Sequence, residues 1–224
     1  MKKRFAASTV LMSTALVLGS TTAWAASSTA TIEFTSNGAP VVVDPDVLIP
    51  DSENPYLPPG DNEPTYETGS LTLDFVSNFD FGANELVFDK EEFKATNQKP
   101  FLQVTDRRDI LSKWDVKVKL GKFADKNGNE SLTGSILTIN PGVVQTLKSV
   151  GDYSIPTTKG IVLKPGGDEE TILTAEKGTF STWQVYWKGN GETNDFIKID
   201  IPVNEQTKGK HIATMEWTLS DVVN

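Results

Sequence analysis

The sequence predicts an all-β protein, either an antiparallel β-sandwich or a barrel-like sheet, with a long Pro-rich loop near the N-terminus. From residue 70 to 224, short runs alternate apolar and polar residues, and turn-forming residues separate the runs. Because successive side chains of a strand point to opposite faces, this alternation is typical of antiparallel strands with one buried face. No segment keeps a helical period over three turns, and only residues 142–150, after Pro141, are compatible with a brief helix.

Apolar side chains mark one face of each expected strand in turn. About nine or ten strands fit into a chain of this length, which suffices for one domain with a sizeable core. The apolar positions are Leu71, Leu73 and Phe75; Trp114, Val116, Val118 and Leu120; Trp183, Val185 and Trp187; Ile197, Ile199, Ile201 and Val203; and Ala213, Met215, Trp217 and Leu219.

Residues 1–25 have the order of features of an export signal. Lys2, Lys3 and Arg4 precede a short apolar stretch, and Ala23-Trp24-Ala25 forms a small-x-small cleavage site. The apolar stretch is shorter than the roughly 20 residues of a membrane span, and no second one follows. We therefore expect a secreted protein with no membrane span.

Two further zones precede the expected β domain at 70–224. Residues 26–35 contain Thr-Ile-Glu-Phe, which indicates a short strand. Residues 36–69 are acidic and rich in Pro, and prolines at this density block helices and central strands. This composition favours a solvated linker over a functional loop, although a loop of such length inside a domain is unusual.

Charge and cysteine content limit the partners and the compartment. Removing the leader takes three of the 21 basic residues and none of the 30 acidic ones, so the net charge falls from −9 to −12. Such an acidic surface repels nucleic acid and anionic lipid, whereas a neutral glycan or a basic protein patch fits it. Cys is absent. An exported chain without disulfides leans toward a Gram-positive source, and its core must stabilise it alone.

Two tryptophan triplets, Trp114-Asp115-Val116 and Trp217-Thr218-Leu219, are the first candidate binding site. Each places an indole and a branched aliphatic side chain on one strand face, with the middle residue on the other. Residue type and phase favour core positions for both indoles. The functional alternative requires an edge or a groove, where an indole can stack on a sugar ring.

Trp183, Tyr186 and Trp187 form a second aromatic cluster, with rings on both faces of one strand. Tyr186 lies opposite the two indoles, so we expect it to face solvent. Exposed aromatic rings beside polar donors often hold carbohydrate, because ring and sugar face desolvate each other. These three residues are therefore candidates for carbohydrate stacking.

The sequence argues against catalysis and against a cofactor or metal. His211 is the only His and Cys is absent, which removes Cys nucleophiles, multi-His metal sites and most triads. A glycosidase needs two carboxylates, but none lies in an apolar run that would raise its pKa. Residues 125–131, DKNGNES, resemble the first half of a calcium loop but lack its distal Glu, so a hairpin turn at Asn127-Gly128 is favoured.

Three segments in order resemble the WxL domain of Gram-positive surface proteins. Residues 71–82, LTLDFVSNFDFG, resemble its opening strands, and residues 103–108, QVTDRR, followed by Trp114-Asp115-Val116, resemble the lead-in and first WxL motif. Residues 213–221, ATMEWTLSD, resemble the second motif, which the family also places at the C-terminus. Val116 stands where the family usually has Leu, but it keeps a branched aliphatic side chain on the same face.

The resemblance implies non-covalent attachment to the cell wall, with peptidoglycan as ligand and both motifs required. It also implies complexes with other cell-surface proteins, some of which are linked to adhesion to host extracellular proteins. No sortase signal follows Leu219, which agrees with attachment by the fold itself. We therefore expect a non-catalytic protein of the cell surface that binds the wall. The alternative is a protein-interaction subunit of a surface complex, in which a sheet edge or the Pro-rich segment docks a partner.

Overall fold

The computed structural model describes residues 29–33, 38–86, 88–108, 112–147, 154–177 and 179–222. The chain divides into two units, Met1–Phe34 and Thr35–Asn224. In the first unit, residues 29–33 are exposed and form no strand, although they belong to the strand expected at 26–35. The expected leader, residues 1–25, lies outside the described residues.

The described part of the second unit is built almost entirely of antiparallel strands, as the alternation predicts. A single turn of 3-10 helix, η1 (Val203–Glu205), precedes the last strand. The strands are β1 (Leu71–Val76), β2 (Glu92–Ala95), β3 (Phe101–Asp106), β4 (Lys113–Leu120), β5 (Phe123–Ala124), β6 (Glu130–Ser131), β7 (Ile136–Ile139), β8 (Val143–Thr146), β9 (Thr157–Thr158), β10 (Ile161–Leu163), β11 (Glu170–Ala175), β12 (Ser181–Tyr186), β13 (Asn194–Asp200) and β14 (Met215–Val222).

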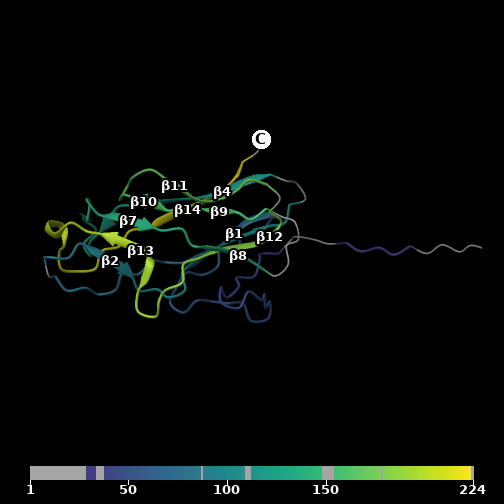
Figure 1. Ribbon diagram of the computed structural model, residues 1–224, viewed down its shortest axis with the longest axis horizontal. Helices are drawn as coiled ribbons and strands as arrows, with labels where there is room; N and C mark the ends of the chain where they lie inside the picture. Colours follow the sequence, from purple (N-terminus) through teal and green to yellow (C-terminus); the bar gives the residue numbers. More distant parts are fainter. Residues whose placement is uncertain are drawn as a thin grey trace, which may run out of the picture. The chain divides into compact units, whose positions relative to one another are not determined.

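These strands form three sheets of four strands and one short hairpin. Sheet A has the order β1-β3-β12-β8, sheet B the order β10-β7-β13-β2, and sheet C the order β14-β4-β11-β9, while β5 pairs with β6. Figure 1 shows β4, β11 and β14 of sheet C in a layer over β1 and β12 of sheet A. In these strand orders, β1 is an edge strand of sheet A and β14 is an edge strand of sheet C.

One apolar core lies between the sheets, and strand alternation decides which residues reach it. In β4, Trp114, Val116, Val118 and Leu120 are buried, whereas the residues between them are partly exposed. Sheets A and B contribute side chains such as Val104 and Ile197 to the same core. The expected antiparallel pattern with one buried face is therefore confirmed for β4.

Sheet A departs from this pattern because both of its faces are covered. Every residue of β3 is buried, including Gln103 and Thr105 on the face away from the core. Residues from the Pro-rich segment lie on that second face, where Val42 packs with Phe75 and Phe101. Alternation alone does not reveal this second layer, because polar residues at every other position normally indicate solvent.

The brief helix considered for residues 142–150 is wrong. Residues 143–146 form β8, which pairs with β12 through Val143↔Tyr186 and Thr146↔Trp183. Pairing with a neighbouring strand satisfies the backbone there, and three of the four residues are β-branched, which favours the strand. Residues 148–150 lie outside the described part of the chain.

Candidate functional site

The two tryptophan triplets lie on neighbouring strands of sheet C. β14 pairs with β4 in antiparallel register, so that Leu219 lies opposite Val116 and Trp217 opposite Val118. Trp114 lies opposite Asp221, just beyond the second triplet. The triplets therefore overlap at the Val116–Leu219 pair, and residues from both line one continuous face of the sheet.

The two indoles have different environments on that face. Trp114 is fully buried, and its Nε1 donates to Asp106 Oδ2 at 3.1 Å and to Thr179 Oγ1 at 2.8 Å. Trp217, on the edge strand, is only partly buried. Asp115 and Thr218, the middle residues of the triplets, belong to the opposite face, where Thr218 is exposed. The structure thus gives Trp114 a core position and leaves part of Trp217 accessible.

An ion-pair network joins the first triplet to Asp221, two residues beyond the second triplet. Arg108 Nε lies 2.9 Å from Asp106 Oδ1, and Arg108 Nη1 lies 2.6 Å from Asp221 Oδ1. Because Asp106 also accepts from Trp114, the guanidinium connects the buried indole to β14. Hydrogen bonding to Asp106 raises the pKa of Arg108 above its ordinary value. The network therefore connects the end of β3, which carries Asp106, to the end of β14, which carries Asp221.

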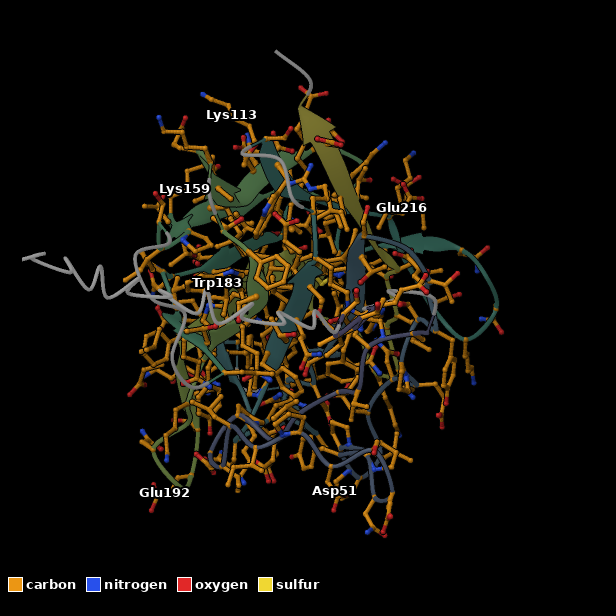
Figure 2. The ribbon with its side chains drawn as sticks, turned by 90° about the vertical axis from the view of Figure 1, so that its right-hand side faces the viewer. Asp51, Lys113, Lys159, Trp183, Glu192 and Glu216 are labelled. Carbon is orange, nitrogen blue, oxygen red and sulfur yellow. The ribbon has the colours of Figure 1, made fainter. Side chains whose placement is uncertain are left out.

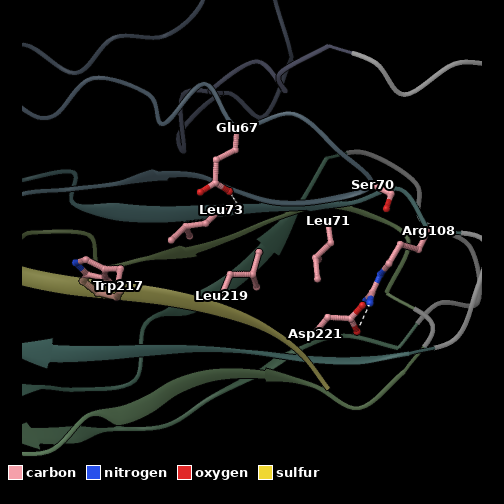
Figure 3. A pocket seen from close by; sticks show the side chains of 8 residues that line it. All are labelled: Glu67, Ser70, Leu71, Leu73, Arg108, Trp217, Leu219 and Asp221. Carbon is pink, nitrogen blue, oxygen red and sulfur yellow. Dashed lines mark hydrogen bonds and ion pairs between the residues drawn. The ribbon is translucent and has the colours of Figure 1, made fainter. Parts of the chain in front are cut away.

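A cleft of about 370 Å³ opens between the edge strands β1 and β14 (Figure 3). Figure 3 shows Leu71 and Leu73 of β1 facing Trp217 and Leu219 of β14 across it, and Arg108 with Asp221 at one end. Apolar side chains and polar or charged side chains line the cleft in equal number, and Glu67 lies beside Leu73. Its lining consists of Glu67, Ser70, Leu71, Leu73, Arg108, Trp217, Leu219 and Asp221.

Phe79 connects Trp217 to the second aromatic cluster. Its ring is 6.4 Å from that of Trp217 and 6.1 Å from that of Trp187, edge to face in both pairs. Edge-to-face pairs at this separation add to the stabilisation that burial gives. Phe79 therefore fixes the Trp217 ring from the side of the core. The sequence patterns gave this residue no role in the site.

The second aromatic cluster is covered by the protein itself. Trp183 and Trp187 are each about 1% exposed, and their Nε1 atoms donate to Thr179 O at 2.5 Å and to Asn140 O at 2.9 Å. Figure 2 shows Trp183 among the strands, whereas Lys113 and Glu216 lie at the periphery. In this arrangement neither indole offers a free ring face for a sugar.

The expectation that Tyr186 faces solvent is wrong. It lies opposite the two indoles, as its phase predicts, but it is 5% exposed because the Pro-rich segment covers that face. Its hydroxyl donates to Asp46 Oδ1 at 3.0 Å. Burial, together with this acceptor, raises the pKa of Tyr186 well above its usual range.

The loop at residues 125–131 is a hairpin turn, as favoured from the sequence. Asp125 Oδ1 accepts from the backbone N–H groups of Asn127 at 2.8 Å and Asn129 at 2.9 Å, and Gly128 has a φ of 83°. These hydrogen bonds lower the pKa of Asp125. In the described part of the chain, no group of three or more His, Cys, Asp or Glu is arranged to hold a metal ion.

Antiparallel sheets with an open cleft between two edge strands form an architecture in which a ligand can bind. The chain belongs to the WxL family: residues 21–222 match the family model described as WxL domain, surface cell wall-binding. No curated protein and no solved structure matches the chain. The expected membership is confirmed, and it makes this a binding domain of the cell surface that attaches to the cell wall. Within the described residues, no helix has the length and hydropathy to cross a membrane.

Proposed function

We propose that the protein holds peptidoglycan non-covalently, with the cleft between β1 and β14 as the binding site. The observation that carries this proposal is the partly exposed Trp217, which lines a cleft beside leucine and charged side chains, adjacent to a buried Trp114 that fixes the neighbouring strand. An indole with one accessible face can stack on the apolar face of a sugar, since the two surfaces desolvate each other. The protein would then be secreted and retained on the wall of a Gram-positive cell.

The two motifs have different roles in this proposal. Trp217 and Leu219 contact the glycan, whereas Trp114 and Val116 position β14 by filling the core beneath it. Asp115 and Thr218 lie on the other face of sheet C and stay outside the contact. Both motifs are then needed for binding, but only the second touches the ligand.

Charged groups at the cleft provide orientation. Arg108 is held by Asp106 and Asp221, and Glu67 Oε2 accepts from Leu73 N at 3.1 Å. These groups can exchange hydrogen bonds with the hydroxyl and acetamido groups of a neutral glycan. A polymer with many phosphates is disfavoured, because the chain is strongly acidic.

Sedimentation with purified, protein-free peptidoglycan tests the proposal. The wild-type protein should sediment with the wall material, whereas Trp217→Ala should remain in the supernatant. Phe88→Ala is the matched control, because Phe88 is 64% exposed and does not line the cleft. Circular dichroism must show that both variants are folded. Equal sedimentation of Trp217→Ala and Phe88→Ala would overturn the proposal.

A second function, docking of a partner surface protein or a host extracellular protein, is favoured by one observation. Val47, Ile49 and Leu57 of the Pro-rich segment are all more than half exposed, and they line a cleft of about 260 Å³. Clustered apolar side chains on a surface often mark protein interaction sites. Replacing all three with Ser should abolish partner capture and leave wall sedimentation intact. Unchanged capture would contradict this second function.

A further inference from the structure

Three glutamines form a row across sheet A on the face away from the core. Gln184 of β12 lies opposite Gln103 of β3 and opposite Gln145 of β8, so the three side chains align across three strands. Gln145 Nε2 donates to Gln184 Oε1 at 3.0 Å, and Gln184 Nε2 donates to Gln103 Oε1 at 3.0 Å. Gln103 Nε2 donates to Asp74 Oδ2 at 2.9 Å, which completes a continuous chain of hydrogen bonds.

The same amides bind the backbone of the Pro-rich segment at alternate residues. Gln103 Nε2 donates to Val41 O at 2.9 Å, Gln184 Nε2 to Val43 O at 2.7 Å, and Gln145 Nε2 to Pro45 O at 2.7 Å. Gln103 Oε1 in turn accepts from Val43 N at 3.0 Å. The glutamine row therefore binds an extended peptide through its main chain, in the way that strand addition uses backbone groups.

Side chains at two points complete this attachment of residues 41–56, which we call the strap. Val42 is buried with Phe75, Phe101 and Tyr186. Asp46 lies 2.6 Å from Lys99 Nζ and 2.9 Å from Lys188 Nζ.

A short turn connects the strap to the rest of the sheet. Asp61 N donates to Pro58 O at 3.2 Å, and Gly60 between them has a φ of 72°, which is the geometry of a tight turn with Gly at its third position. Beyond the turn, Asn62 Nδ2 donates to Val76 O at 2.8 Å at the edge of β1. The strap contacts described above therefore all precede a connection of about four residues in the chain. In this arrangement, an element can be exchanged between copies of a protein.

We propose that the glutamine row is a peptide-binding site that accepts the strap of a second copy, so that neighbouring copies of the protein link by exchanging straps. The occupant fits by identity, because a second copy offers the same backbone carbonyls, the same Val42 and the same Asp46. The tethered strap has an effective concentration in the millimolar range, so exchange prevails where copies are crowded or where the attachment in cis is weakened. This inference concerns a different face from the cleft and does not depend on glycan binding.

Two full-length variants with reversed charges test the proposal. The first carries Asp46→Lys, so its strap is repelled by its own Lys99 and Lys188. The second carries Lys99→Asp and Lys188→Asp, so its sheet repels its own Asp46. Each variant alone should be a monomer. When mixed, the straps are complementary only to the other copy, and we expect a one-to-one complex of twice the mass by size exclusion with light scattering.

A matched control uses an ion pair far from the strap in sequence. Lys94 lies 2.6 Å from Asp195, and the reversed variants Lys94→Asp and Asp195→Lys should not associate when mixed. Addition of Gln184→Leu to both strap variants should abolish the mixed complex, because Val43 O of each exchanged strap then loses its donor. Monomers in the mixture, with both variants folded by circular dichroism, would overturn the proposal. Association of either variant alone, or association that survives Gln184→Leu, would also overturn it.

Discussion

Arg108 Nη1 lies 2.6 Å from Asp221 Oδ1, and this pair connects the segment before the first tryptophan triplet to the strand that carries the second. The side chain of Arg108 is 6% exposed, whereas that of Asp221 is 43% exposed. The contact therefore joins a buried cation to the open end of the β1–β14 cleft. The pair therefore provides a physical connection between the two motifs, whose indoles lie on different strands.

Removal of the guanidinium should be strongly destabilising. In Arg108→Met, Asp106 loses both hydrogen bonds from the guanidinium and keeps those from the backbone N–H of residue 108, from Trp114 and from Thr179. Breaking a buried ion pair from one side costs about 3–5 kcal/mol. Urea unfolding should show this loss for Arg108→Met and a much smaller one for Asp221→Asn. Equal losses of unfolding free energy in the two variants would contradict the larger role given to Arg108.

Replacement of Trp114 by Phe tests the hydrogen bonds of the buried indole with a smaller loss of volume than replacement by Ala. Phe keeps most of the apolar surface but removes Nε1, which leaves Thr179 Oγ1 and Asp106 Oδ2 with one donor fewer. The free energy of unfolding should fall by about 1–3 kcal/mol. Trp217→Phe, on the edge strand, is the control and should cost less. If Trp114→Phe proves neutral, the indole nitrogen does not fix this position.

Acid should weaken the attachment of the strap. The hydrogen bonds from Lys99 and Lys188 lower the pKa of Asp46 from 3.8 to about 2. Because the folded pKa lies below the unfolded value, the stabilisation is complete above pH 3.8 and is lost as the pH falls to about 2. An NMR titration of the Asp46 carboxyl carbon should show the low midpoint. In a Lys99→Met and Lys188→Met variant, the midpoint should return toward 3.8, and an unchanged midpoint would contradict the assignment.

The hairpin at Asp125 should be stable without calcium. Its carboxylate already accepts two backbone hydrogen bonds. Calcium should leave the melting temperature unchanged, whereas Gly128→Ala should cost about 1 kcal/mol, because Ala is strained at a φ of 83°. A rise in melting temperature with calcium, absent in Asp125→Asn, would show that the loop binds the ion.

Much of the fold follows from local patterns, and the candidate site follows only in part. The alternation in residues 113–120 predicts a strand with Trp114 on its buried face, because each position depends only on its neighbours along the strand. That Val116 and Leu219 lie opposite each other depends on the pairing of strands about 100 residues apart, which periodicity does not specify. The cleft depends on the same long-range pairing.

The burial of the second face of sheet A could not be predicted from the sequence, for a related reason. Gln103, Gln184 and Thr105 alternate with apolar residues, which normally indicates a solvated face. The strap covers that face and satisfies the amides with backbone carbonyls. Tyr186 is buried by the same cover, so its phase was predicted correctly and its exposure was not.

NMR of the indole Nε1 signals tests the central claim most directly, because only one of the described tryptophans lines the β1–β14 cleft. Soluble, neutral peptidoglycan fragments should shift the signal of Trp217 in proportion to binding. The signals of Trp114, Trp183 and Trp187, whose Nε1 atoms are hydrogen-bonded inside the protein, should move little. Binding of the fragments with no change at Trp217, or no binding at all, would contradict the account.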